Sequence, residues 1–176
     1  MSMEREMVLI LDFGGQYNQL IARRVRDLNA YCEVHPYTIG LDRIRKMNPK
    51  GIIFTGGPNS VYEEKSPSIS GEIYDMGIPI LGICYGAQLM SYTLGGEVKT
   101  ATTREYGKVK LHVEEDSPIF KDVKEKSATW MSHTDYVEKL AEGFHVTATT
   151  ESCPTAAFEN SDKKLYGVQF HPEVQH

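Results

Sequence analysis

The chain has 176 residues, 40% of them hydrophobic and 24% charged, with a formal net charge of −5 and a pI near 5.7. These values fit one folded globular domain and exclude a disordered chain. The acidic balance, with Lys and Arg scattered along the chain, argues against nucleic acid as a partner. We expect no membrane partner and a cytoplasmic protein, because no apolar run approaches the roughly 20 residues that span a bilayer and residues 1–7 lack the apolar centre of a signal peptide.

The first half of the chain alternates β-branched runs with amphipathic stretches. In chain order we predict strands at 8–11, 32–37, 51–55 and 78–84, and helices at 17–28, 41–47, 69–76 and 85–94. In the first helix, one face carries Leu20, Ile21, Val25 and Leu28. This alternation indicates an α/β fold, with a parallel sheet and helices on both of its faces.

The second half of the chain, from Gly96 onward, has little helical pattern. Its short apolar runs predict strands at 108–113, 129–131, 145–150, 155–159 and 165–170.

Gly-rich turns follow three of the predicted strands. They are Phe13-Gly14-Gly15, Gly56-Gly57-Pro58 and the segment from Gly82 to Gly86. Ligands of open α/β sheets bind at the carboxyl ends of the strands. We therefore expect the three turns to line one crevice.

The segment Gly82-Ile83-Cys84-Tyr85-Gly86 has the form of a nucleophile elbow, with cysteine in the nucleophile position. At the start of a helix, a thiolate faces backbone N–H groups and the positive end of the helix dipole. The alternative is a Gly-rich turn with a buried, inert thiol. We expect that inert role for Cys32 and Cys153, and no disulfide or metal site, because the three cysteines are far apart and lack zinc-ligand spacing.

His171 ends a predicted strand, and Pro172 and Glu173 follow it. A thiol nucleophile needs a base and a group that orients the base, and this pair can supply both. The alternative is a surface His and Glu at a strand end. We expect structural roles for the other strand histidines, His35, His112 and His145.

Two segments, 82–89 (GICYGAQL) and 168–174 (VQFHPEV), resemble motifs of the class I glutamine amidotransferases. Three more resemble the glutaminase domains of GMP synthetases: 11–17 (LDFGGQY), 104–107 (REYG) and 131–135 (MSHTD). The similarity extends from residue 8 to residue 174. It implies a flavodoxin-like, mostly parallel sheet with a small antiparallel extension, in a single domain at residues 1–176.

The resemblance implies a catalytic triad of Cys84, His171 and Glu173. Cys84 would attack the side-chain amide of L-glutamine and form a γ-glutamyl thioester, His171 would move the proton, and Glu173 would hold His171 in the useful tautomer. The backbone N–H groups of Gly57 and Tyr85 would form the oxyanion hole.

Substrate recognition is implied for four further residues, namely Gln88, Ser132, His133 and Asp135. Asp135 is the natural partner for the substrate ammonium group. Without the resemblance, Gln88 reads as a helix-surface residue and the segment 132–135 as a polar strand end.

The resemblance also implies a partner, an ATP-pyrophosphatase domain or subunit of GMP synthetase that converts XMP to GMP with the released ammonia. The chain stops at His176, whereas the family normally continues, so we expect a domain truncated or excised at its C-terminus. We expect ATP and Mg in the partner and no cofactor in this domain, because the sequence has no G-x-x-x-x-G-K-[S/T] loop.

Three alternatives stay open. The chain could be the glutaminase domain of an anthranilate, carbamoyl phosphate or CTP synthase, although the segments 14–17 and 104–107 favour GMP synthetase. It could be a non-catalytic regulatory module, which the filled triad positions disfavour. It could also hydrolyse other γ-glutamyl compounds.

Overall fold

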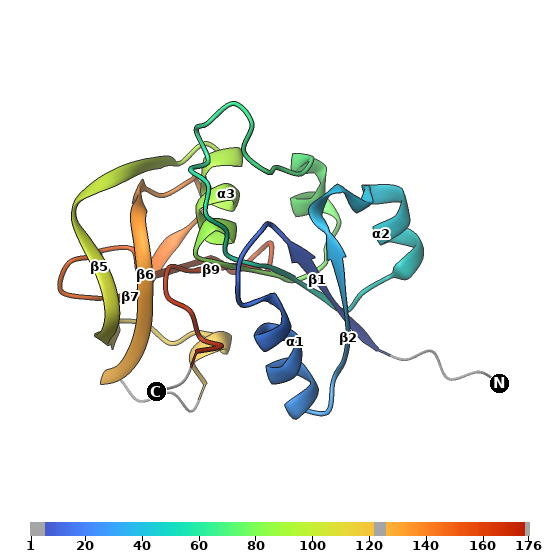
Figure 1. Cartoon of the computed structure of the whole chain (residues 1–176), viewed down its shortest axis with the longest axis horizontal. Coiled ribbons are helices and arrows are strands. Elements are labelled where there is room, and N and C mark those ends of the chain that lie inside the picture. Colours follow the sequence, from blue (N-terminus) through green and yellow to red (C-terminus); the bar gives the residue numbers. More distant parts are fainter. Residues whose placement is uncertain (1–5, 122–125, 175–176) are drawn as a thin grey trace.

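The computed structural model describes residues 6–121 and 126–174, and for residues 103–105, 126, 127 and 133 it describes the backbone alone. In this part of the chain, the strands form one mixed sheet in the order β2-β1-β3-β4-β9-β8-β7-β5-β6 (Figure 1). The strands are β1 Met7–Asp12, β2 Tyr31–Pro36, β3 Gly51–Phe54, β4 Ile80–Ile83, β5 Glu97–Val113, β6 Lys126–Lys139, β7 His145–Thr149, β8 Ala157–Asn160 and β9 Leu165–Val168.

The first five strands in this order, from β2 to β9, run parallel to one another, and the remaining pairs are antiparallel. With β9 as the fifth strand, the parallel part has the 2-1-3-4-5 order of flavodoxin-like folds. The predicted fold class, a flavodoxin-like parallel sheet with an antiparallel extension, is confirmed.

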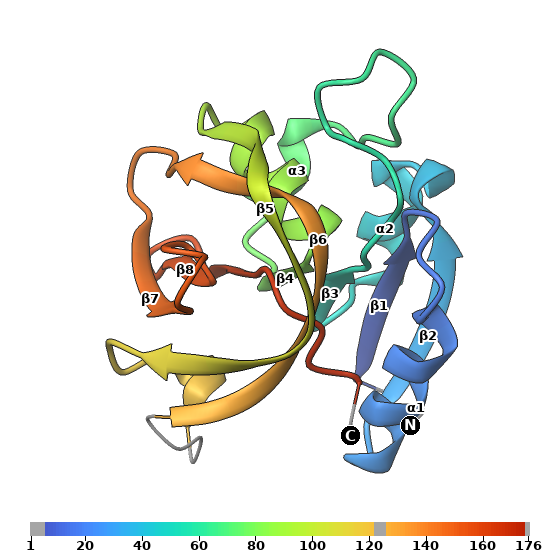
Figure 2. The ribbon, with the colours of Figure 1, turned by 60° about the vertical axis from the view of Figure 1, so that its left-hand side comes forward.

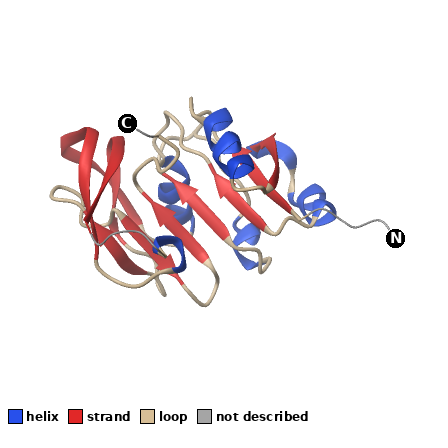
Figure 3. Cartoon of the chain, turned by 90° about the horizontal axis from the view of Figure 1, so that it is seen from below, coloured by secondary structure: helices blue, strands red, loops and turns tan. Residues whose placement is uncertain are grey.

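Helices cover both faces of the parallel strands (Figure 3). They are α1 Asn18–Asp27, α2 Leu41–Met47 and α3 Tyr85–Thr93, with short 3₁₀ turns at η1 Tyr37–Ile39, η2 Gly71–Asp75 and η3 Pro118–Phe120. Among the described residues, no helix has the length and apolar character that a membrane crossing requires.

Strand β1 contributes side chains to the hydrophobic cores on both faces of the sheet. Its side chains alternate between the faces of the sheet. Ile10 packs in the cluster that contains Ile21 of α1, whereas Leu9 and Leu11 pack in the cluster that contains Ile44 of α2. The three β1 residues are fully buried, which favours folding by about 1.5–3 kcal/mol for each side chain.

In the first half of the chain, three differences between the predicted elements and the structure stand out. Leu28 is 81% exposed rather than packed, because α1 ends at Asp27 and Leu28 is its C-cap. The predicted helix at 69–76 is the 3₁₀ turn η2, and β4 begins at Ile80 rather than at residue 78.

The largest difference is the length of β5 and β6, which have 17 and 14 residues and form a long curved ribbon (Figure 2). Within the described residues, β5 pairs with β7 only at His112 and Val113. Most of β5 therefore lies beside β6 alone, and its many charged and threonine residues hide the apolar alternation that identifies a strand. The predicted polar strand end at 132–135 is consequently the middle of β6.

Candidate active site

Cys84 lies at a strained turn between β4 and α3. Its backbone has φ 52° and ψ −107°, a conformation that L-residues avoid. The flanking glycines leave no room for a side chain: a Cβ on Gly82 would lie 2.7 Å from the Ala87 nitrogen, and one on Gly86 would lie 2.6 Å from the Phe54 Cβ. The strand-turn-helix geometry of a nucleophile elbow is present, as the motif predicted.

The pairing of β4 with β9 brings the two motifs together. Ile83 is opposite Val168 in parallel register, and the Cys84 N–H donates to the Val168 carbonyl at 2.8 Å. The residues that follow each strand, Cys84 and Gln169, therefore leave the sheet side by side. Two residues later, the His171 N–H donates to the Trp130 carbonyl of β6 at 2.8 Å, which fixes the backbone that carries the imidazole.

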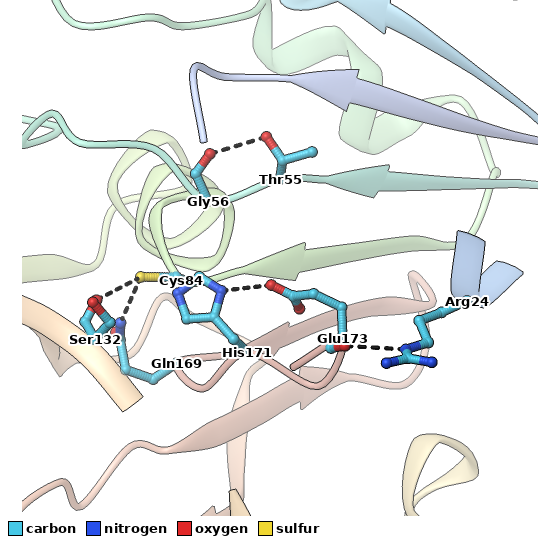
Figure 4. A network of polar contacts seen from close by, with 8 residues as sticks. All are labelled: Arg24, Thr55, Gly56, Cys84, Ser132, Gln169, His171 and Glu173. Carbon is cyan, nitrogen blue, oxygen red and sulfur yellow. Dashed lines mark hydrogen bonds and ion pairs between the residues drawn. The ribbon is translucent and has the colours of Figure 1, made fainter. Parts of the chain in front are cut away.

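The His171 ring lies beside Cys84, and its Nδ1 is 2.7 Å from Oε1 of Glu173 (Figure 4). A turn closed by the Val174 N–H on the His171 carbonyl brings the carboxylate back to the ring. The Glu173 carbonyl accepts from Nε of Arg24 at 3.1 Å, which ties this segment to α1. The side chains of His171 and Glu173 are both buried, so the alternative that they form a surface pair is wrong.

The charge state of His171 follows from these neighbours. Burial opposes the charged imidazolium, but hydrogen bonds to Cys84 and Glu173 and the negative charges of the thiolate and the carboxylate outweigh it. Together they raise the pKa of His171 to about 10. An imidazolium at neutral pH can stabilise a thiolate and can later donate a proton to a leaving group.

Gln169 contacts Cys84, and the sequence analysis missed this residue. Its side chain is fully buried, and its Nε2 donates to Sγ of Cys84 at 3.5 Å. Its Oε1 accepts from Nε2 of Gln88 at 3.2 Å, which orients the amide. A polar side chain between Val168 and Phe170, in an otherwise apolar run, was the available signal.

Gln88 lies in α3, one turn after Cys84, and is 3% exposed. Its Nε2 donates to Gln169 and also to the Asp135 carbonyl at 3.0 Å, so both amide hydrogens are engaged. The remaining polar atom, Oε1, is an acceptor, so it can bind a donor group of a ligand in the pocket that Gln88 lines. The helix-surface alternative for Gln88 is therefore wrong.

The turn after β3 carries the Gly57 N–H, one of the two expected oxyanion donors. The Thr55 hydroxyl accepts from the Phe13 N–H at 2.9 Å and donates to the Gly56 carbonyl at 2.9 Å. Because the carbonyl and N–H of a trans peptide point in opposite directions, this bond turns the Gly57 N–H away from Thr55. A Cβ on Gly57 would lie 2.5 Å from the Phe13 carbonyl oxygen, so only glycine fits.

The Tyr85 N–H is the other expected oxyanion donor. Tyr85 is the first residue of α3, and N–H groups in a first helical turn have no intrahelical partner.

All three Gly-rich turns line one pocket of about 430 Å³, as predicted. Its walls include Gly14, Gly57, Cys84, Gln88, Ser132, Asp135, His171 and Glu173. The volume suits a small polar ligand such as an amino acid. The side chain of His133, a predicted substrate contact, lies outside the described residues.

The histidines and cysteines for which we expected structural roles, His35, His112, His145, Cys32 and Cys153, do not line this pocket. His35 and His145 pair with Glu33 and Glu115, and neither lines the pocket. Cys32 and Cys153 are buried and form no disulfide bond. In the part of the chain that the structure describes, no three His, Cys, Asp or Glu side chains group in a way that could hold a metal.

The fold and the site define an α/β protein with a cysteine at a nucleophile elbow beside a His-Glu pair. The family model for glutamine amidotransferase class-I matches residues 9–176. This chain belongs to that family.

The chain is similar to GMP synthases from several Clostridium strains. The chain is 60% identical to the glutamine-hydrolysing GMP synthase of Clostridium novyi over 176 residues, and 62% identical to that of Clostridium botulinum strain Alaska E43 over 174 residues. The matches cover 100% and 99% of this chain, but the chain spans only about a third (34%) of the length of these relatives. The predicted resemblance to the glutaminase domains of GMP synthetases is confirmed.

Solved structures agree on the fold. A Thermoplasma acidophilum protein described as one of the subunits of a GMP synthase superposes with a TM-score of 0.89 at 28% identity, covering 99% of this chain and 88% of that one. A Thermotoga maritima glutamine amidotransferase has a TM-score of 0.78 at 21% identity, with 98% and 78% coverage.

Proposed function

We propose that this chain hydrolyses L-glutamine to glutamate and ammonia and supplies the ammonia that converts XMP to GMP. The observation that carries the proposal is Cys84, held at a strained elbow beside the His171–Glu173 pair and inside a pocket of amino-acid size. The high identity with GMP synthases supports the acceptor.

In the first half of the reaction, the Cys84 thiolate attacks the δ-carbon of glutamine and a carbon–sulfur bond forms. The carbonyl oxygen gains negative charge, and the N–H groups of Gly57 and Tyr85 would stabilise it by donating hydrogen bonds to it. In a serine protease, removing one oxyanion-hole donor costs about 2.7–4 kcal/mol of transition-state stabilisation. The imidazolium of His171 then gives its proton to the amide nitrogen, and ammonia leaves a γ-glutamyl thioester.

In the second half, His171 is neutral and acts as a base. It takes a proton from a water molecule, whose oxygen attacks the thioester carbon. The carbon–sulfur bond breaks, glutamate leaves, and the thiolate–imidazolium pair returns. The net change is glutamine plus water to glutamate plus ammonia. Glu173 keeps the imidazole in the tautomer that presents Nε2 to the sulfur.

Substrate binding in this proposal uses acceptors for the donor groups of glutamine. Oε1 of Gln88 and the carboxylate of Asp135 both belong to residues that line the pocket. Asp135 would receive the α-ammonium, and Ser132 and His133 would contact the polar end of the substrate. ATP and Mg²⁺ would bind the partner, an ATP-pyrophosphatase domain or subunit, and the cytoplasmic location stays a prediction.

Among the alternatives, a glutaminase that serves an anthranilate, carbamoyl phosphate or CTP synthase is disfavoured by the identity with GMP synthases. A non-catalytic module is disfavoured by the strained conformation of Cys84, because strain of this kind persists where function uses it.

The test is GMP formation from XMP, ATP and glutamine, after this chain is mixed with an isolated ATP-pyrophosphatase domain of GMP synthetase. Ammonium in place of glutamine is the control for the partner. We expect glutamine-dependent GMP formation that Cys84→Ala abolishes. Formation with ammonium but not with glutamine would count against the proposed pairing.

A further inference from the structure

Asp135 is held by hydroxyl groups that the reaction scheme does not use. Its side chain is buried, and its residue lines the active-site pocket. Ser60 Oγ donates to Oδ2 at 2.6 Å, while the hydroxyls of Thr100 and Tyr62 lie 3.1 and 3.3 Å from Oδ1. A distance of 2.6 Å is typical of a charge-assisted O–H···O⁻ bond. Ser60 is therefore the strongest of these three contacts.

The two weaker contacts share protons. The hydroxyls of Tyr62 and Thr100 also lie 2.7 Å from each other. Their two protons are therefore shared among three contacts, two with Oδ1 of Asp135 and one between the hydroxyls. Either hydroxyl can donate to Asp135 while the other donates to its neighbour. Loss of the Tyr62 hydroxyl alone therefore leaves Thr100 free to donate to the carboxylate.

The donors come from two elements. Thr100 is the register partner of Asp135 across the β5–β6 ribbon, so the sheet itself brings them together. Ser60 and Tyr62 belong to the loop after β3, which also carries Gly57 three residues before Ser60. One short segment thus contacts the carboxylate through Ser60 and presents the backbone N–H of Gly57 to the reacting amide.

We propose that Ser60, assisted by Tyr62 and Thr100, positions the carboxylate of Asp135 so that it can bind the α-ammonium group of the substrate. The loop after β3 then contributes to substrate specificity. This inference rests on the proposed glutaminase function. Because Gly57 and Ser60 are only three residues apart, the loop fixes the separation between the oxyanion site and the ammonium site. That separation selects an amino acid whose amide lies the right number of bonds from its α-carbon.

The test compares glutamine with 4-carbamoylbutanoate, which is glutamine without the α-amino group, in the mixture with the synthetase domain. Ammonia release gives kcat and KM for both. We expect Ser60→Ala to lower kcat/KM for glutamine about 10-fold, mainly through KM, and to change it less than about 2-fold for the analogue. Ser60→Thr, which keeps the hydroxyl, should restore most of the loss, and Tyr62→Phe should have a smaller effect than Ser60→Ala.

Ser66→Ala is the matched control. Ser66 lies in the same loop, and its hydroxyl donates to the Ser60 carbonyl rather than to Asp135. If the loop were merely loosened, this variant would imitate Ser60→Ala. An equal loss of kcat/KM for both substrates in Ser60→Ala, or no loss for either, would overturn the inference.

A second measurement does not depend on turnover. L-Glutamate and glutarate, which differ only in the α-amino group, are compared for protection of Cys84 from iodoacetamide. The wild-type chain should prefer glutamate, and Ser60→Ala should reduce that preference about 10-fold. An unchanged preference refutes the inference even if glutamine hydrolysis succeeds. Failure of wild-type hydrolysis with the preference intact refutes the proposed function instead.

Discussion

A single methyl group at Gly56 would test whether the position of His171 limits the reaction. A Cβ there would lie 3.1 Å from Cε1 of His171 and 3.6 Å from the Cys84 Cβ. Ordinary contacts of a Cβ begin near 3.4 Å, so the ring must retreat by a few tenths of an ångström. Gly56 does not have a positive φ, so alanine introduces contact rather than backbone strain.

The size of the effect follows from the position of Cε1. This atom lies between the two ring nitrogens, so its displacement disturbs both the contact with Cys84 and the 2.7 Å bond to Glu173. Losing part of two charge-assisted hydrogen bonds costs about 1–2 kcal/mol. We therefore expect Gly56→Ala to lower kcat for glutamine hydrolysis by roughly 5- to 30-fold.

Gly51→Ala is the matched control, at the other end of β3. Its Cβ would meet only the Pro79 carbonyl oxygen, at an ordinary 3.8 Å. Glutamate release gives kcat for both variants, and urea unfolding reports their stability. A folded Gly56→Ala protein with wild-type kcat would refute the reasoning. Equal losses in the two variants would assign the effect to the strand rather than to the ring.

Three further predictions concern the nucleophile and its partners. Cys84→Ser should abolish glutamine-dependent activity while leaving the urea midpoint within error of the wild type, and more than a trace of remaining activity would reject Cys84 as nucleophile. Gln169→Leu should lower kcat about 10-fold, because the sulfur loses a donor; an unchanged kcat would show that this contact is only structural. The raised pKa of His171 keeps the imidazolium through neutral pH, so its contribution to activity should be lost as the pH rises through about 10. Glu173→Gln removes one cause of the raised pKa and should move the alkaline limb of the kcat/KM profile to lower pH, and a limb that stays in place would contradict the assigned cause.

Local patterns predicted most elements of the parallel half of the molecule, apart from the end of α1, the 3₁₀ turn η2 and the start of β4. Its strands are short and buried, so they are apolar runs bounded by turns, and the bounds of α2 were predicted without error. The nucleophile elbow could also be predicted from its local sequence, because only glycine fits at positions 82 and 86. Only parts of the long strands β5 and β6 could be predicted, since charged residues and threonines interrupt their apolar alternation.

The sequence by itself determined the chemistry that is available: a cysteine between glycines, a His-Pro-Glu segment, and motifs that extend over nearly the whole chain. Only the tertiary structure decided which groups meet. Parallel pairing of β4 with β9 places Gln169 against the sulfur, and pairing of β5 with β6 places Thr100 opposite Asp135, 35 residues away. Such contacts depend on strand register and on loop paths, and these are set by the packing of the whole sheet rather than by any local run of residues.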